Sequence, residues 1–298
     1  MVRTVYPIPD VARGLIKGLA EAVKSTDYDL VVRVDVTKHW KAHRIPSFQD
    51  FVSTLQQPFE ETPLSPISLS TLLDEYPLVK KYLYDASGNV ANTTGHCCDR
   101  PDMWQLATPN DIHFILHSSY DYVWVIEDDF GMVGPHDDYK TLLMQTIMDL
   151  DRQAGDAPFV AVPFGRIESP FQCPAPFVKN RHTIEFEQIL SLETWRCVSD
   201  SFRRFSRPAA LTLDSALKKG MFSHVETFIQ PILLSQRVDI YWWDPPMFHQ
   251  KLTDTGVLDC ARKENVSFAL FQRTLSDSSS KYYYSACAHS RQGWSSFS

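Results

Sequence analysis

Three consecutive carboxylates, Glu127, Asp128 and Asp129, are the residues of this chain best suited to chemistry. They follow the aromatic and β-branched run at residues 120–126, which predicts a buried strand. Such a strand has no place for adjacent acids, so the triplet is expected at the carboxyl edge of a sheet, where open α/β sheets bind ligands. A divalent cation would relieve the mutual repulsion of the carboxylates, and oxygen ligands suit Mn²⁺ or Mg²⁺ bound to a diphosphate. The alternative is a solvated acidic turn.

Two further acids are expected at strand ends. Residues 30–36 form a β-branched run typical of a buried strand, and Asp35 lies near its carboxyl end. Residues 79–84 predict a second short strand that ends at Asp85.

The remaining patterns predict an alternating order of strands and helices. Helices are expected at residues 11–23, from Trp104 with Thr108 or Asn110 as the cap, and at 140–151 and 209–219, the last closed by Gly220; a further strand is expected at 159–163. This order indicates an α/β fold with a mostly parallel, Rossmann-like sheet and helices on both faces. Without a repeat or linker, residues 1–298 are expected to form one domain.

Composition excludes some function classes. The 298 residues are 44% hydrophobic and carry a net charge of -7, so nucleic acid is not an expected partner. No apolar run is long enough for a membrane span. The six cysteines show no zinc-ribbon spacing, and Asn92 and Asn265 begin glycosylation triplets. A secretory lumen and the cytoplasm both stay open as locations.

Two segments resemble a known family. Residues 124–129, Trp-Val-Ile-Glu-Asp-Asp, are similar to the metal-binding Asp-x-Asp motif of GT-A fold glycosyltransferases, in the Glu-Asp-Asp form of N-acetylglucosaminyltransferase I and related inverting enzymes. Residues 204–213 and 220–231, which include Ser223, His224 and Glu226, resemble a segment of many glycosyltransferase-like proteins. The resemblance therefore implies a GT-A-like fold.

The resemblance also implies roles for the acids on the donor side. Asp129 would bind Mn²⁺ or Mg²⁺ directly, Glu127 would act through a water, and Asp128 would face the ribose or the donor sugar. Asp35 would lie close to the nucleoside, and Asp85 is counted with these donor-binding candidates. The implied donor is a UDP-sugar or GDP-sugar.

On the acceptor side, the resemblance implies that Glu226 is the general base of an inverting transfer. Glu168, Glu185 and Glu187 are rival bases. His224 and His249 are candidate metal ligands, each with a purely structural role as the alternative.

Two other clusters have open interpretations. Tyr241, Trp242 and Trp243 suit either an acceptor-sugar platform or a core strand. Four arginines suit either a diphosphate clamp or a solvated helix face: Arg196, Arg203, Arg204 and Arg207.

The resulting prediction is a metal-dependent glycosyltransferase that moves a sugar from a nucleotide diphosphate to a hydroxyl of a glycan or glycoprotein. Residues 1–129 would form the nucleotide-sugar-binding half and residues 130–298 the acceptor-binding half. A metal-dependent phosphoester hydrolase, or a non-catalytic carbohydrate-binding protein of the same fold, is the alternative.

Overall fold

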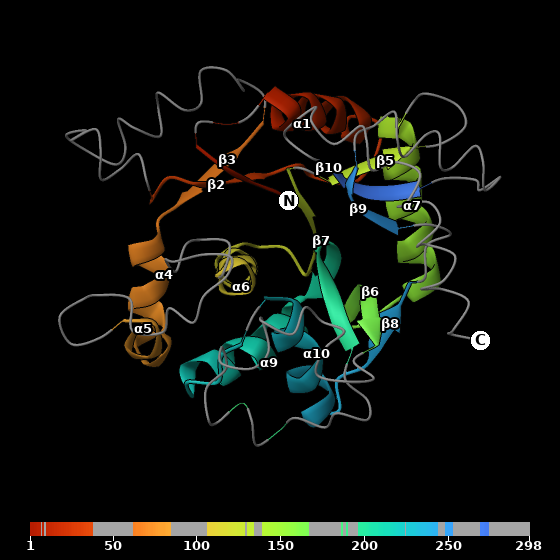
Figure 1. Cartoon of the computed structure of the whole chain (residues 1–298). Helices are drawn as coiled ribbons and strands as arrows, with labels where there is room; N and C mark the ends of the chain where they lie inside the picture. The colour runs from red at the N-terminus through yellow and green to blue at the C-terminus, as the bar shows by residue number, and fades with distance from the viewer. Residues whose placement is uncertain are drawn as a thin grey trace, which may run out of the picture.

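The fold is known from a computed structural model. It describes residues 1–6, 8, 10–37, 62–84, 106–128, 130–133, 139–166, 186, 189, 196–223, 225–243, 248–252 and 269–273, and the structural statements below concern these residues. Figure 1 shows their arrangement, with the helices placed around a central twisted sheet.

The central sheet has seven strands in the order β3-β2-β1-β4-β7-β6-β8. Six strands run in one direction, and only β7, which pairs antiparallel with both β4 and β6, runs in the other. The strands are β1 (Val2–Val5), β2 (Val32–Asp35), β3 (Leu64–Ile67), β4 (Tyr122–Glu127), β6 (Phe159–Arg166), β7 (Arg196–Ser206) and β8 (Ile240–Trp242).

Helices cover both faces of this sheet. Along β4, Val123 and Val125 belong to one buried cluster, whereas Trp124 and Ile126 belong to the other, as the alternation of side chains along a strand requires. The first cluster includes side chains of α4 (Leu69–Glu75), α5 (Pro77–Leu83), α6 (Ala107–His117), α9 (Arg207–Lys218) and α10 (Val225–Ser235). The second includes side chains of α1 (Asp10–Val23) and α7 (Tyr139–Ala154). The predicted fold class, a mostly parallel α/β sheet between two helical layers, is therefore confirmed.

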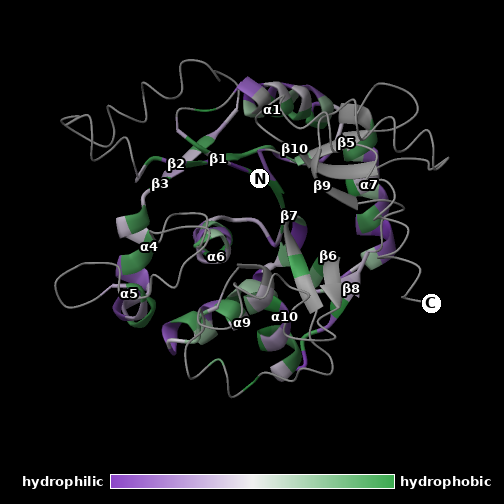
Figure 2. Ribbon diagram, in the orientation of Figure 1, coloured by the Kyte–Doolittle hydropathy of each residue, from purple (hydrophilic) through white to green (hydrophobic). Residues whose placement is uncertain are grey.

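Amphipathic patterning explains why the helices form there. Hydrophobic and hydrophilic residues occupy different sides of α1 and α7 in Figure 2. In α1 the buried residues Ala12, Leu15, Ile16 and Leu19 recur at helical spacing and pack against the sheet. Gly220 has a φ of 81°, so it follows α9 in the left-handed conformation predicted for it.

Two local predictions are wrong. Residues 79–84 belong mostly to α5, because Pro77 favours a helix start and the buried Val79 and Leu83 lie on one helical face. The caps expected for α6 are inside it: Thr108 and Asn110 are buried, and their side chains bond to arginines of the sheet instead.

A second, smaller sheet has the strand order β5-β10-β9. Its strands are β5 (Phe130–Val133), β9 (Phe248–Leu252) and β10 (Ala269–Arg273). Because β5 begins directly after Asp129, the acidic triplet joins the end of β4 in the large sheet to the first strand of the small one. None of the helices in the described part of the chain combines the length and apolar composition that crossing a bilayer requires.

Candidate functional site at the carboxyl edge

The strand order of the large sheet reverses at β1. The chain proceeds from β1 outward to β2 and β3, and later returns to place β4 on the other side of β1. Open α/β sheets bind ligands outside the carboxyl ends of the strands at such a reversal, where the connections on the two sides diverge. Since Glu127 ends β4 and Asp128 follows it, both residues lie at this point of the sheet.

Glu127 is fixed by a buried ion pair. It is 6% exposed, and Arg3, its register partner in β1, donates a hydrogen bond to its Oε1. Arg3 also donates to both carboxylate oxygens of Asp111 in α6, at 3.1 and 3.2 Å. Arg203 of β7 also donates to this carboxylate, at Oδ2. Glu127 is thus part of an Arg3–Asp111–Arg203 network that ties β4, β1, β7 and α6 together (the buried network).

Asp128 occupies a different environment. Its side chain is only partly buried, and its Oδ2 accepts a hydrogen bond of 2.6 Å from the hydroxyl of Thr4. Burial and the neighbouring Glu127 raise the pKa of Asp128, although Thr4 and Arg3 oppose the shift. A carboxylate whose ionised form is disfavoured in this way gains from a nearby cation.

Asp35 reaches the same edge from the other side of β1. It ends β2 in register with Val5, and its Oδ1 accepts a hydrogen bond of 2.8 Å from the backbone N–H of Thr37. With strand spacings of about 4.8 Å, β2 and β4 are separated by roughly 10 Å across β1. Asp35 and Asp128 therefore flank the end of β1, where Val5 is 50% exposed.

Three of the predicted site residues, Asp85, Asp129 and His224, lie outside the described residues. The strand expected before Asp85 is wrong, because that segment belongs to α5.

His249 is placed by the small sheet. Its Cα partner in β10 is Phe271, and the partner of Phe271 in β5 is Gly131. The three residues form one row across the sheet, so the backbone of His249 is about 10 Å from a residue that follows Asp129 by two positions. This register brings the late histidine to the neighbourhood of the triplet.

Glu226 lies in the first turn of α10. Helix α10 leads into β8, and the first residue of β8 pairs with Phe159, which lies near the amino end of β4. The last turn of α10 is therefore near the amino edge of the sheet, and Glu226 lies at the other end of the helix. Ser223 and Thr227 are buried on either side of Glu226 in the sequence, and their hydroxyls hydrogen-bond to each other at 2.8 Å. The rival bases Glu168, Glu185 and Glu187 are outside the described residues.

The arginine cluster has neither of its predicted roles where the structure describes it. Arg203 and Arg204 are buried on opposite faces of β7; Arg203 bonds to Asp111, and Arg204 to Asp151 and two backbone carbonyls. Arg207 donates to the carbonyls of Ser118 and Tyr120. These contacts could not be predicted from the sequence, because the acidic partners of Arg203 and Arg204 belong to helices that are far from β7 along the chain.

The aromatic segment fits the strand interpretation best. Tyr241 and Trp242 lie in β8 and are partly buried, each against one of the two core clusters. Trp243 packs edge-on against Phe202, with ring centroids 5.7 Å apart.

Sequence reasoning missed the residues that hold the edge in place. Arg3 is the odd residue in the first apolar strand, and Asp111 is an acid within an apolar helical stretch; a lone charge in such a pattern is a signal of a buried ion pair. It also missed a cluster of Glu75, His113 and His117, in which the two histidines are four residues apart on α6. The i, i+4 spacing was visible, but the glutamate comes from another helix.

Comparison with known proteins gives matches only among solved structures. No family model matches the sequence, and no curated protein does. The crystal structure of mouse xyloside xylosyltransferase 1 in its apo form is 12% identical, with a TM-score of 0.43 over 90% of this chain and 95% of that one. The galactosyltransferase LgtC in complex with donor and acceptor sugar analogs is 9% identical, with a TM-score of 0.44 over 97% and 94%. CMP:2-keto-3-deoxy-manno-octonic acid synthetase complexed with CTP is 10% identical, with a TM-score of 0.39 over 82% and 87%.

These identities and TM-scores are low. The function therefore has to be argued from the residues of this chain.

Proposed function

We propose that this protein is a metal-dependent glycosyltransferase that moves a sugar from a nucleotide diphosphate to a hydroxyl of a glycan or glycoprotein. The observation that carries the proposal is the position of the acidic triplet: its first two residues end the central strand at the point where the strand order reverses. The resemblance of residues 124–129 to the metal-binding motif of GT-A glycosyltransferases supports the same assignment.

The described residues fit a divalent metal at this edge. Asp128 offers a partly buried carboxylate whose raised pKa a cation would lower again, and oxygen ligands suit Mn²⁺ or Mg²⁺. In our proposal Asp128 and Asp129 hold the metal, with His249 reaching it from the small sheet and His224 as a further candidate. Glu127 is committed to Arg3, so we assign it the anchoring of the triplet rather than a water-mediated contact.

The donor would lie across the end of β1. In our proposal Asp35 meets the ribose of a UDP-sugar or GDP-sugar and Asp128 lies on the diphosphate side, and the position of the two carboxylates on either side of the exposed Val5 supports this. The metal, when bound, supplies the positive charge that stabilises the departing diphosphate.

Glu226 is the proposed general base. The acceptor hydroxyl oxygen attacks the anomeric carbon while the bond from that carbon to the diphosphate oxygen breaks, and the electron pair of that bond leaves with the nucleoside diphosphate. The hydroxyl proton passes to the Glu226 carboxylate. One displacement of this kind inverts the anomeric centre. Residues 1–129 would bind the donor, and residues 130–298, which hold Glu226, the acceptor.

The test is calorimetric titration of UDP, GDP, CMP and ADP with and without Mn²⁺, followed by transfer assays with the matching nucleotide sugar. Asp129→Ala should abolish Mn²⁺-dependent nucleotide binding, whereas Glu226→Gln should bind the nucleotide normally and lose transfer. Asp10→Ala, which removes a fully exposed carboxylate of α1, is the matched control.

Equal nucleotide affinity in the wild type and in Asp129→Ala would contradict the metal assignment. Metal-dependent phosphate release from an ester, without nucleotide-sugar transfer, would favour the hydrolase. Carbohydrate binding without any nucleotide binding would favour the non-catalytic protein.

A further inference from the structure

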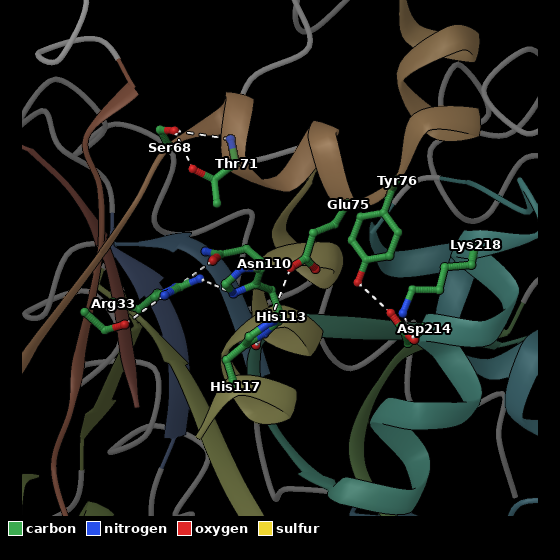
Figure 3. A network of polar contacts seen from close by, with 11 residues as sticks. Arg33, Ser68, Thr71, Glu75, Tyr76, Asn110, His113, His117, Asp214 and Lys218 are labelled. Atoms are coloured by element: carbon green, nitrogen blue, oxygen red, sulfur yellow. Dashed lines mark hydrogen bonds and ion pairs between the residues drawn. The ribbon is translucent and has the colours of Figure 1, made fainter. Parts of the chain in front are cut away.

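A second group of ionisable side chains lies between α4 and α6 and shares no residue with the acidic triplet. Glu75 is the last residue of α4, and His113 and His117 lie one turn apart on α6. Figure 3 shows these three side chains converging, with Arg33 reaching toward His113 from β2. Arg33 lies in the same row of the sheet as Arg3 and Glu127, so this cluster (the Glu75 cluster) is on the face of the sheet that α6 covers, whereas Asp128 bonds to Thr4 on the opposite face.

The spacing of the ligand atoms matches a tetrahedral metal site. The Nε2 atoms of His113 and His117 lie 3.4 and 3.3 Å from the same Glu75 Oε1, and all three ligand atoms are within 4.8 Å of one another. Bonds of about 2.0–2.1 Å to nitrogen and oxygen place neighbouring ligands of a tetrahedral zinc ion about 3.3–3.4 Å apart. Hydrogen bonds from a charged nitrogen to a carboxylate are shorter, about 2.7–2.9 Å.

The ring of His117 is oriented as a metal ligand requires. Its Nδ1 lies 2.8 Å from the carbonyl oxygen of His113, and because a carbonyl only accepts, this Nδ1 carries the proton. The lone pair of the neutral ring is therefore on Nε2, the atom that faces Glu75. Metal-binding histidines commonly donate their other N–H to a carbonyl in this way.

His113 differs because its Nδ1 faces Arg33. The guanidinium lies 2.9 Å away and can only donate, so the neutral ring carries its proton on Nε2. For a metal ion to bind Nε2 of the neutral ring, this proton must shift to Nδ1, and Arg33, which keeps its other partners, must release Nδ1. Arg33 is itself held in place by Asn110 and Ser65, each at 2.8 Å.

We propose that Glu75, His113 and His117 bind one divalent transition-metal ion, with Zn²⁺ as the best match and water as the fourth ligand. Two imidazoles and one carboxylate are a donor set that suits Zn²⁺ rather than Mg²⁺. The side chains of Glu75 and His117 are 31% and 57% exposed, so an ion can enter from solvent. The bound ion would link the end of α4 to α6 and stabilise the folded state by an amount that grows with the logarithm of its affinity.

The test is titration of Zn²⁺ into protein stripped with a chelator, followed by calorimetry and by the thermal midpoint. The wild type should bind one Zn²⁺ and melt at a higher temperature, and Glu75→Gln and His117→Ala should each lose at least tenfold in affinity. Asp74→Asn is the matched control, since this neighbouring carboxylate pairs with Lys80 instead. Co²⁺ in place of Zn²⁺ should give the visible absorption of a tetrahedral site in the wild type and in Asp74→Asn, but not in Glu75→Gln or His117→Ala.

Because the chain has ten histidines and six cysteines, binding alone does not identify the site. Unchanged Zn²⁺ affinity in the double variant Glu75→Gln/His117→Ala would overturn the proposal, as would the absence of binding to the folded wild type. Mn²⁺-dependent nucleotide binding should persist in that variant, and Zn²⁺ binding should persist in Asp129→Ala, so the two proposals fail independently.

Discussion

The carboxyl edge of the sheet and the Glu75 cluster both gather ionisable side chains against α6, but they are supported in different ways. At the carboxyl edge the support is ionic and buried: Asp111 is 0% exposed and bonds to both Arg3 and Arg203. At the Glu75 cluster the support is mixed: one buried cation, Arg33, donates to His113, and Tyr76, the residue after Glu75, is a neutral donor to Asp214 of α9 at 3.0 Å.

The difference indicates how each region tolerates change. Removing one member of a buried ion network leaves the other charges without compensation, which costs far more than the network itself contributes. A partly exposed cluster can be rehydrated when one member is lost. We therefore expect substitutions at the carboxyl edge to change both ligand binding and the free energy of unfolding. Substitutions in the Glu75 cluster should change metal binding with little effect on the stability of the metal-free protein.

The largest effect is expected for Asp111→Asn. The substitution leaves two buried arginines without their shared carboxylate and should lower the free energy of unfolding by about 3–5 kcal/mol. Urea denaturation measures this. The control is Asp149→Asn, which breaks the exposed pair with Arg152 on α7 and should cost less than about 1 kcal/mol. Equal losses in both variants would contradict the distinction between the two kinds of support.

Glu127 and Asp128 should separate stability from binding. Glu127→Gln weakens the pair with Arg3, which keeps Asp111, and should cost about 1.5–3 kcal/mol. Asp128→Asn should stay within about 1 kcal/mol of the wild type, because the amide oxygen can still accept from Thr4, and yet lose Mn²⁺-dependent nucleotide binding. Denaturation and calorimetry on the same samples test the two variants. A larger loss of stability in Asp128→Asn than in Glu127→Gln would rule out the anchoring role of Glu127.

Tyr76→Phe examines the neutral support of the second region. It removes one buried hydrogen bond while Asp214 keeps Lys218, so the expected loss is about 1 kcal/mol. Burial and Asp214 raise the pKa of Tyr76 above its ordinary 10.0, so above pH 10 the unfolded chain loses this proton before the folded one does. Stability should therefore fall as pH rises past 10, and less steeply in Tyr76→Phe than in the wild type. Parallel slopes would contradict the assignment.

The smallest effect is the pH dependence due to Asp128. Its pKa in the folded state is raised above 3.8, so the folded protein binds this proton more tightly than the unfolded chain does. The resulting stabilisation is complete below pH 3.8 and is lost as pH rises through the folded-state pKa. The wild type should lose stability relative to Asp128→Asn over that range. A constant difference would show that burial does not act on this carboxylate.

Much of the fold could be predicted because its signals are local. The apolar run before Glu127 gave the central strand, the run before Asp35 gave β2, and helical spacing gave α1 and α7. Residues 79–84 were misassigned because a short apolar run suits either a strand or a helix. The small sheet has no comparable local signal, since β5 pairs with a strand more than a hundred residues later.

The sequence by itself determined that the chain is an α/β protein and that an acidic triplet ends a buried strand, because adjacent carboxylates are incompatible with the apolar interior on either side of that strand. Only the tertiary structure decided what each acid does. The side chain of Glu127 pairs with Arg3 on one face of the sheet, whereas that of Asp128 accepts a hydrogen bond from Thr4 on the other, because successive residues face opposite sides of a strand. The Glu75 cluster likewise depends on the packing of two helices from distant parts of the chain, which no local pattern encodes.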